Sequence, residues 1–369
     1  MTKNIAPMSE YKPPLVIAYG LGVDSTAALV RLRQEHIRPD LILFADVGFE
    51  RQETYAFLPV IQDWLRRADF PEVTVVKYCP SDTKWWPPYA TLEENCLTNA
   101  TLPSLAFGFK SCSLKWKVTP QNKFTDGWAL AQECWARGGK VHKVIGYDAS
   151  PKDRKRFAHA VGMEDPQYEY WYPLIDWDMH RDACKEVIRA AGLPVPPKSA
   201  CIACPATQPD ELREFRKSYL RRIVIMEARA KPRLMGCWNQ QEIDAYNAET
   251  MPKRVVKWER KCQEAAATGR PLPSRPNPYK VGDGTAGLWR SATKTKPAMM
   301  TDFIVSEGLL PVEEVRMLQE RAPKEIIDNQ QAFANGEEIP NWHDFLEQFS
   351  PEDALDEVPG CGGCQMVSV

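Results

Sequence analysis

Residues Leu15 to Ser25 read LVIAYGLGVDS and decide the fold class of this chain. The apolar run Leu15–Ala18 predicts a buried strand, and Asp24–Ser25 opens a segment with helical patterning. The glycine-rich turn Gly20–Gly22 lies between them. A strand, a glycine turn and a helix N-terminus together form a cradle for anions, because backbone N–H groups and the helix dipole both favour negative charge. The stretch therefore favours a phosphate-bearing ligand, above all a nucleotide.

The spacing of these glycines excludes two common phosphate loops. It is neither the GxxxxGK[ST] pattern of a Walker loop nor the GxGxxG pattern of a dinucleotide-binding fold. An ordinary strand-to-helix turn is therefore the competing interpretation of the same residues. The pattern alone leaves these two alternatives open.

The composition of the chain neither demands nor excludes a polyanionic partner. Its 369 residues carry 47 Lys and Arg against 49 Asp and Glu, which gives a formal net charge of −2. No apolar run reaches membrane-spanning length and the N-terminus lacks an apolar signal core, so we expect a cytoplasmic protein with no membrane partner. In a reducing compartment the 11 cysteines are expected to be free thiols, metal ligands or catalytic groups.

Strands and helices alternate along the first half of the chain. Runs at Leu41–Ala45, Val73–Tyr78 and Val141–Gly146 predict further strands, with a helical pattern between the first two. This alternation is typical of an α/β fold with a parallel sheet covered by helices on both faces. Ligands of such sheets bind beyond the carboxyl ends of the strands. Asp46–Gly48 and Gly146–Asp148 follow predicted strands, so we expect them to converge with the glycine turn on one crevice.

The sequence predicts four parts along the chain. We expect a nucleotide-binding α/β domain at 1–206 and a helical extension at 207–267. Residues 268–300 are rich in Pro, Gly, Ser and Thr and predict a linker or a surface wrap. Residues 301–369 predict a small helical region that ends in the tail PGCGGCQMVSV.

Three cysteines carry the strongest metal signal. Cys201 and Cys204 form a CxxC in KSACIACPAT, and Cys112 lies in the cationic segment FGFKSCSLKWK. Three thiolates from two segments can hold an iron–sulfur cluster. Zinc is the competing occupant because structural zinc sites also use thiolate ligands, and free thiols in a reduced protein are the third interpretation.

Two further groups of residues are candidates for chemistry. Cys361 and Cys364, in GCGGC, predict exposed, mobile thiols with a redox or nucleophilic role, and a chain end without a role is the alternative. Lys152–Arg156 directly follows the strand end at Gly146–Asp148, where basic side chains neutralise phosphate or sulfate. A solvated surface is the alternative interpretation of that basic run.

The motifs resemble, in order, those of the 3′-phosphoadenosine-5′-phosphosulfate (PAPS) reductase-like proteins of phages and bacteria, a branch of the PP-loop ATP pyrophosphatases. YGLGVDSTAAL is similar to the family's PP-loop, usually written SGGxDS. FADVGFERQETYAFL, LPSLAFGFKSCSLKWKVTPQ, VIGYDA, YWYPLIDWDMHRDAC and GLPVPPKSACIACPAT follow. The resemblance covers roughly residues 14 to 230. Leu21 stands where the family has glycine, Gly20 where it has serine, and ASPKDRKR replaces a segment in which the family often has glutamate.

This resemblance implies a Rossmann-like adenine nucleotide α-hydrolase fold with a nucleotide in the crevice. The nucleotide-binding residues that it implies are Tyr19, Gly20, Leu21, Gly22, Val23, Asp24, Ser25, Thr26, Asp46, Gly146, Asp148, Arg154 and Arg156. Asp24 and Ser25 are the implied catalytic residues of the loop, and Mg²⁺ is expected beside a triphosphate. Cys112, Cys201 and Cys204 resemble the [4Fe–4S]-binding cysteines of relatives that thiolate nucleic acids.

Three functions follow from the resemblance. The main prediction is an ATP-dependent sulfurtransferase, in which an acceptor oxygen attacks the α-phosphate, pyrophosphate leaves, and sulfur then displaces AMP. The second is a PAPS or APS reductase, in which Cys361 or Cys364 attacks the sulfate sulfur and a thioredoxin-like thiol releases sulfite. The third is an accessory protein that binds a nucleotide without turnover. The expected partners are an adenine nucleotide, a nucleic-acid or base acceptor, a sulfur donor or thioredoxin-like reductant, and, in one alternative, a second copy of the chain.

Overall fold

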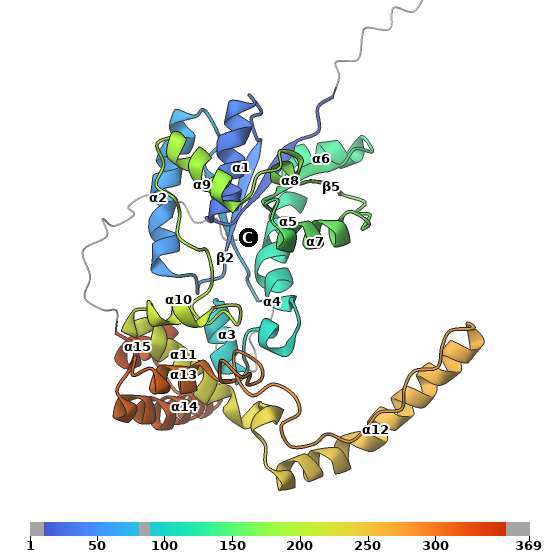
Figure 1. Ribbon diagram of the computed structural model, residues 1–369, viewed down its shortest axis with the longest axis vertical. Helices are drawn as coiled ribbons and strands as arrows, with labels where there is room; N and C mark the ends of the chain where they lie inside the picture. Colours follow the sequence, from blue (N-terminus) through green and yellow to red (C-terminus); the bar gives the residue numbers. More distant parts are fainter. Residues whose placement is uncertain (1–10, 81–88, 352–369) are drawn as a thin grey trace, which may run out of the picture.

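A five-stranded parallel sheet forms the centre of the computed structural model, which describes residues 11–80 and 89–351 (Figure 1). All neighbouring strands pair in parallel, in the order β3-β2-β1-β4-β5. The strands are β1 (Leu15–Tyr19), β2 (Leu41–Asp46), β3 (Val73–Lys77), β4 (Val141–Ile145) and β5 (Tyr168–Trp171). The predicted parallel α/β sheet is confirmed, with β5 as a strand that the sequence pattern did not predict.

Alternating side chains along β1 separate two apolar layers. Leu15, Ile17 and Tyr19 pack in one layer with helices α1 (Val23–Gln34), α2 (Gln52–Arg67) and α9 (Arg181–Ala190). Val16 packs in the opposite layer, beside α5 (Thr119–Asp126) and α6 (Ala129–Ala136). Side chains of a strand point alternately to opposite faces, and a parallel strand is apolar on both when helices cover both. The prediction of helices on both faces is therefore confirmed, and the whole is a Rossmann-like α/β sheet.

Helices from the C-terminal half build a second apolar core, which confirms the predicted helical C-terminal region. α11 (Lys217–Ala230) lies at its centre and contacts α3 (Leu92–Thr98), α13 (Met300–Ser306) and α14 (Val312–Ala334). α15 (Trp342–Phe349) covers this core with Phe345 and Phe349. Shorter helices complete the body: α4 (Ser111–Ser113), α7 (Pro151–Ala160), α8 (Pro173–Asp176) and α10 (Pro209–Arg213).

A long arm projects from this body (Figure 1). It consists of α12 (Gln240–Ala267), of which only Ile243 and Ala265 are buried, and of residues 268–280, which return along the helix without regular structure. The Pro-rich stretch expected as a linker or surface wrap thus packs, at its start, on α12. Among the described helices, none combines the length and the apolar character that a membrane span needs.

Candidate functional site

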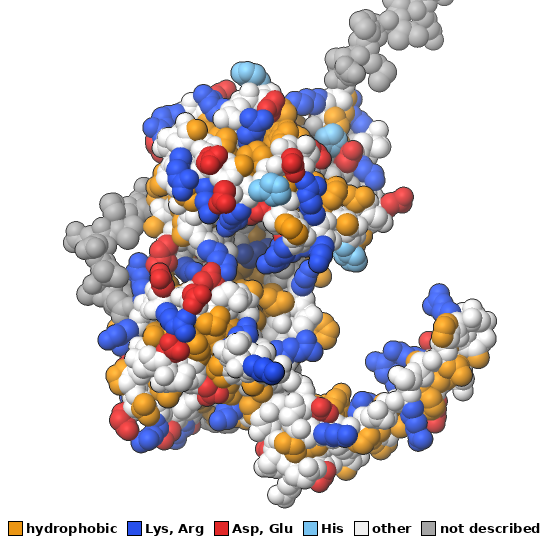
Figure 2. All heavy atoms as spheres, in the orientation of Figure 1, with side chains coloured by type: hydrophobic (Ala, Val, Ile, Leu, Met, Phe, Trp, Pro, Cys, Tyr) orange, Lys and Arg blue, Asp and Glu red, His pale blue; other side chains and the backbone are white. Residues whose placement is uncertain are grey.

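A cleft of about 700 Å³ opens beyond the carboxyl ends of β1 and β4. The strand order changes direction here, because β2 and β3 lie on one side of β1 while β4 and β5 lie on the other. Ligands of open α/β sheets bind at such a point. Two of the three strand ends that were expected to converge line the cleft, Gly20–Ser25 except Leu21 and Gly146–Asp148, whereas Asp46–Gly48 does not. Figure 2 shows the molecule hollowed in the middle, with Lys and Arg side chains around the hollow.

The loop between β1 and α1 presents its backbone to this cleft. Gly22 is the N-cap residue of α1, and no side-chain hydrogen bond caps this helix end within the described structure. Ser25 Oγ accepts a hydrogen bond from the Gly20 N–H at 3.3 Å and donates one to the Gly22 carbonyl at 3.2 Å. The first N–H groups of a helix have no intrahelical partner. The serine therefore fixes the loop while the N–H groups of the first turn are left for an anion.

Tyr19 and Thr26 anchor the loop from behind. Their hydroxyl oxygens lie 2.9 Å apart, and both side chains are buried. Burial raises the pKa of Tyr19, so its hydroxyl stays protonated. Of the two, only Tyr19 lines the cleft, and their hydrogen bond fixes the position of the strand end against the helix.

Leu21 adopts a backbone conformation that usually belongs to glycine. Its φ is 54°, in the left-handed region, where a Cβ costs about 1–2 kcal/mol. Its side chain is fully buried in the apolar layer of α1 and does not line the cleft. Burying a leucine side chain contributes about 1.5–3 kcal/mol, which offsets this strain. Leu21, which stands where the PP-loop pattern has glycine, therefore points its side chain away from the cleft and does not obstruct it.

Gly146 packs against the loop at the end of β4. A Cβ on this residue would lie 3.0 Å from both the backbone N and the Cα of Ser25. Two residues further on, buried Asp148 lines the cleft and accepts a hydrogen bond from the Ser150 N–H at 2.9 Å. A side chain at 146 would therefore push the end of β4 and the loop apart by a few tenths of an ångström.

An arginine from α9 orients Asp24. Arg181 Nη1 donates a hydrogen bond to Asp24 Oδ2 at 2.5 Å, whereas Oδ1 is buried and has no hydrogen-bond partner within the described residues. Burial raises the pKa of Asp24, and the facing arginine opposes this rise. Magnesium prefers carboxylate oxygens. An unpartnered carboxylate oxygen beside the anion cradle therefore fits a magnesium ion that accompanies a triphosphate.

Basic side chains outnumber acidic ones in the lining of the cleft. The cations are Lys117, Lys143, Lys152, Arg156, Arg181 and Lys198, and the carboxylates are Asp24, Asp148 and Asp153. Lys143 is buried at 3% exposure, and its Nζ donates a hydrogen bond to Asn122 Oδ1 at 3.0 Å. Burial lowers the pKa of Lys143 to about 8. The net positive lining suits a ligand that carries several negative charges.

Besides Leu21 and Thr26, two more of the residues expected near the nucleotide, Asp46 and Arg154, do not line the cleft. Arg156 does line it and pairs with Asp153 at 2.9 Å, but Arg154 pairs with Asp178 instead. Asp46 uses its carboxylate inside the fold, where it accepts hydrogen bonds from the turn after β2 and from a tyrosine of α2. Of the two candidate arginines, the structure therefore brings only Arg156 to the site.

The three candidate metal ligands lie beside the cleft without lining it, near enough to one another for their charges to interact. Cys112 lies in α4, and Cys201 and Cys204 share a turn in which the Cys204 N–H donates to the Cys201 carbonyl at 3.2 Å. Burial raises the pKa of the Cys201 thiol, and the neighbouring charges of Glu50 and the other two cysteines raise it further. Ser113 and Ser199, close in sequence to these cysteines, line the cleft. The three thiols are therefore neighbours of the cleft that the glycine loop lines.

Glu50 and Lys117 connect the thiols with the cleft. Glu50 is 2% exposed and forms an antiparallel bridge with Cys201. Its Oε1 accepts a hydrogen bond from Lys117 Nζ at 2.7 Å, and its Oε2 is buried without a partner in the described part of the chain. Burial lowers the pKa of Lys117, but Glu50, Cys201 and Cys204 more than reverse that effect, so the amine stays charged. Lys117 therefore places a positive charge between the thiols and the ligand.

The spread of the three sulfur atoms bears on the choice of metal. Among the described residues, only His343, Asp344 and Glu347 place three ligand atoms all within 4.8 Å of one another, so the three cysteine sulfurs are more widely spaced. One tetrahedral zinc with bonds of about 2.3 Å would hold its sulfurs about 3.8 Å apart. An iron–sulfur cluster holds its thiolates farther apart, because each binds a different iron. At least one pair of the three sulfurs is therefore too far apart for a single zinc ion without movement, and the iron–sulfur cluster stays a prediction.

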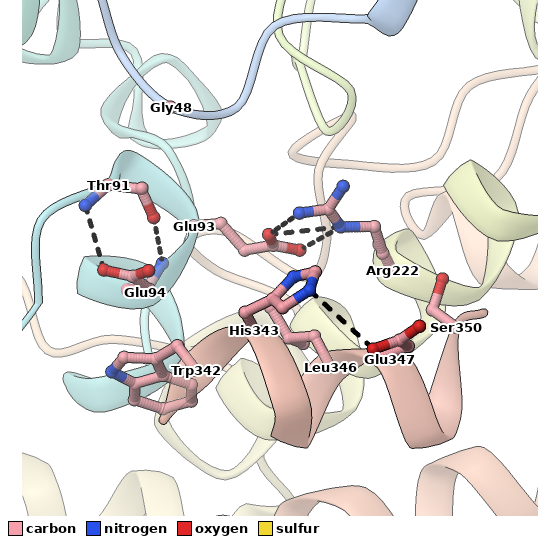
Figure 3. A pocket seen from close by; sticks show the side chains of 10 residues that line it. All are labelled: Gly48, Thr91, Glu93, Glu94, Arg222, Trp342, His343, Leu346, Glu347 and Ser350. Atoms are coloured by element: carbon pink, nitrogen blue, oxygen red, sulfur yellow. Dashed lines mark hydrogen bonds and ion pairs between the residues drawn. The ribbon is translucent and has the colours of Figure 1, made fainter. Parts of the chain in front are cut away.

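A second, smaller cavity of about 210 Å³ lies between α3, α11 and α15 (Figure 3). Glu93 is buried there and forms a salt bridge with Arg222, while Thr91 and Glu94 cap α3. His343 contacts Glu347 at 3.7 Å on the exposed side of α15. These polar groups already pair with one another, so the cavity gives no indication of a ligand.

The chain matches no protein-family model and no curated protein. The resemblance to PAPS reductase-like proteins therefore stays a prediction based on the quoted motifs. The structure itself shows a Rossmann-like parallel sheet. Cys361 and Cys364 lie outside the described residues, and their roles stay predictions as well.

Sequence reasoning missed four cations of the cleft and the buried Glu50. Lys117, Arg181 and Lys198 lie within the quoted motifs KSCSLKWK, DMHRDAC and PPKSAC, so their motif positions were an available signal. Lys143 interrupts the apolar strand VHKVI, and a lysine inside a buried strand is itself unusual. Glu50 carried no comparable signal, because only the folded chain places it beside Cys201.

Proposed function

We propose that this protein is a PP-loop enzyme that binds ATP in the cleft, adenylates an acceptor and replaces the adenylate with sulfur. The proposal is supported above all by one convergence: a helix N-terminus without a side-chain cap and a net positive lining share one cleft, and three thiols lie beside it. An ordinary strand-to-helix turn explains neither the unpartnered Asp24 Oδ1 nor the cations gathered around it.

Pyrophosphate departure is the first step of the proposed reaction. The acceptor oxygen attacks the α-phosphorus, the bond to the β-phosphate oxygen breaks, and pyrophosphate leaves. N–H groups of the loop, with Arg156 and Lys143, stabilise the charge that develops on the leaving group. Asp24 Oδ1 would hold the accompanying Mg²⁺, and Arg181 keeps that carboxylate in place.

Sulfur transfer is the second step, and Cys112, Cys201 and Cys204 would hold the iron–sulfur cluster that serves it. When bound, the cluster supplies an iron at which inorganic sulfide is activated. Sulfide forms a bond to the adenylated atom of the acceptor, the bond from that atom to the AMP oxygen breaks, and AMP leaves with its electron pair. Lys117 neutralises negative charge between the thiols and the cleft.

The test is pyrophosphate release by anaerobically purified protein supplied with ATP, Mg²⁺, sulfide and either tRNA or DNA. We expect a brown protein that releases pyrophosphate, with Asp24→Asn inactive. Asp178→Asn is the matched control, since Asp178 lies outside the cleft lining and its φ of 49° suits asparagine. A colourless protein that releases no pyrophosphate with any nucleic acid or base would overturn the proposal. Sulfite release from PAPS that is lost in Cys361→Ser or Cys364→Ser would favour the reductase instead.

A further inference from the structure

The arm, α12 with residues 268–280, is a braced hairpin. Trp258 Nε1 donates a hydrogen bond to the Pro273 carbonyl at 2.8 Å. Nearer the body, the Asn247 side chain exchanges two hydrogen bonds with the backbone of Tyr279, both at 2.8 Å. The Tyr246 and Tyr279 rings also lie 5.9 Å apart. Contacts at two levels hold the returning segment against α12, so the arm keeps its side chains in fixed positions outside the body.

Residues 251–280 of the arm are strongly basic, whereas its first eleven residues, 240–250, carry three carboxylates and no Lys or Arg. Residues 251–280 contain eight Lys and Arg and two Glu, a net charge of +6, whereas the whole chain carries −2 and the remaining residues therefore −8. Figure 2 shows basic side chains along the arm. The eight cations are Lys253, Arg254, Lys257, Arg260, Lys261, Arg270, Arg275 and Lys280. Such a segregation of charge produces a positive surface that attracts polyanions.

Most of these cations are available to a partner. Lys253 and Arg260 pair with glutamates of α12, and Arg254 stacks on the Tyr279 ring at 4.3 Å. The other five are exposed and form no salt bridge within the described structure: Lys257, Lys261, Arg270, Arg275 and Lys280. A helix of 28 residues is about 42 Å long, a length over which a duplex presents about 25 phosphates.

The apolar side chains of the arm argue against a second copy of this chain as its partner. The aromatic residues Tyr246, Trp258 and Tyr279 contact other parts of the same hairpin or its base. On residues 240–280 the exposed large apolar side chains are Val256 and Leu272. Stable homodimer interfaces need a larger apolar area than two separate side chains provide. Exposed cations on a projecting, braced element match a phosphate backbone better.

We propose that the arm binds the phosphate backbone of a nucleic acid and thereby presents the acceptor to the cleft. The binding itself is independent of the cleft chemistry, and only the acceptor role rests on the proposed function. Arg and Lys contacts to phosphates give affinity with little sequence information, so the arm fixes position while the cleft selects the reacting atom.

The test is fluorescence anisotropy with labelled duplex DNA, duplex RNA and single-stranded RNA of one sequence. The arm variant carries Lys257→Gln, Lys261→Gln, Arg270→Gln and Arg275→Gln. The control removes the same charge from the body with Lys185→Gln, Lys324→Gln, Arg66→Gln and Arg316→Gln. At about 0.1 M salt we expect the arm variant to bind at least about tenfold more weakly than the control, and its salt slope for a duplex to flatten by about 3–4, which is about 0.9 for each lost contact. The three probes show whether DNA or RNA is bound.

Equal affinity and equal salt slope in the two variants would overturn the proposal. Sedimentation of the natural chain and of the arm variant tests the other partner. If the natural chain is a dimer, the arm variant is a monomer and nucleic-acid binding is unchanged, the arm contacts a second copy of the chain instead. ATP affinity is measured on the same samples and should not differ between the variants. If the arm variant loses nucleic-acid binding and keeps its ATP affinity, the proposal for the arm is supported. If the natural chain binds nucleic acid but releases no pyrophosphate, the proposed function is wrong and the proposal for the arm still stands.

Discussion

The two ends of the cleft are built from different parts of the chain. At the phosphate end, the backbone of Gly20–Ser25 forms the anion cradle, and Gly146 packs behind it. Beside the cleft, at the thiol end, the side chains of Cys112, Cys201 and Cys204 are the candidate ligands. A binding site made of backbone groups tolerates most side-chain substitutions and is disrupted only by those that move the backbone. A site made of side chains is disrupted when a substitution replaces a single ligand atom.

The largest effect is expected at the thiol end. Cys201→Ser removes a thiolate ligand, so we expect iron to fall from about four atoms per chain to below a tenth of that value. Iron content and the absorption spectrum of anaerobically purified protein measure this. Cys262→Ser, on the arm, is the matched control and should keep its iron. Unchanged iron in the Cys201 variant would show that this thiol is not a ligand and would remove the contrast between the two ends.

The next effect concerns Leu21, which combines a strained backbone with a buried side chain. Leu21→Gly relieves about 1–2 kcal/mol of left-handed strain but loses the packing of the leucine, so we expect a net destabilisation of about 2–3 kcal/mol. Leu21→Ala keeps the strain and should be less stable than Leu21→Gly by about 1 kcal/mol, the reverse of the order in a helix. Urea unfolding measures both variants. An alanine variant more stable than the glycine variant would show that the φ of 54° carries no strain.

The backbone end is probed directly at Gly146. In Gly146→Ala, the new methyl group would lie 3.0 Å from the backbone of Ser25 and force the loop to shift by a few tenths of an ångström. We expect ATP affinity to fall more than tenfold, because the N–H groups no longer converge on the phosphate. Gly162→Ala is the control, since a Cβ there meets no atom within 4 Å. Equal ATP affinity in both variants, by calorimetry, would show that the loop position tolerates this shift.

Much of the fold could be predicted because β1 and β2 are continuous apolar runs flanked by glycine turns and helical patterns. β5 could not, since Tyr168–Trp171 is a four-residue edge strand of aromatic residues with Glu169 exposed. α12 lies within the helical extension expected at 207–267, but it shows no apolar stripe of its own, because only Ile243 and Ala265 are buried and Pro252 lies inside it. Hydrophobic periodicity reports burial, and these elements bury little.

The candidate site divides in the same way. The loop and the CxxC are local, so their spacing was visible in the sequence. Glu50 joins Cys201 across about 150 residues and Arg181 reaches Asp24 from 157 residues away, so only the folded chain brings these partners together. Sequence therefore predicts which segments carry chemistry, while long-range packing decides which charges surround them.

The smallest expected effect is a pH dependence due to Lys143. Its pKa of about 8 means that the free protein loses this cation as the pH rises from 7 to 9. A bound phosphate favours the charged amine, so ATP affinity should fall over this range by at most about tenfold. Lys143→Met should flatten the profile, and Lys140→Met, an exposed control outside the cleft, should not. ATP titrations at constant ionic strength measure the profiles.

Stability should change in the opposite direction over an overlapping range. In the unfolded chain the amine has its ordinary pKa of 10.5, so between about pH 8 and 10.5 the unfolded state binds more protons than the folded state. The free energy of unfolding therefore rises with pH for the natural chain relative to Lys143→Met, while ATP affinity falls. An affinity that increased with pH would show that Lys143 is neutral in the complex. The phosphate end would then depend on its backbone alone, and the contrast with the thiol end would be sharper still.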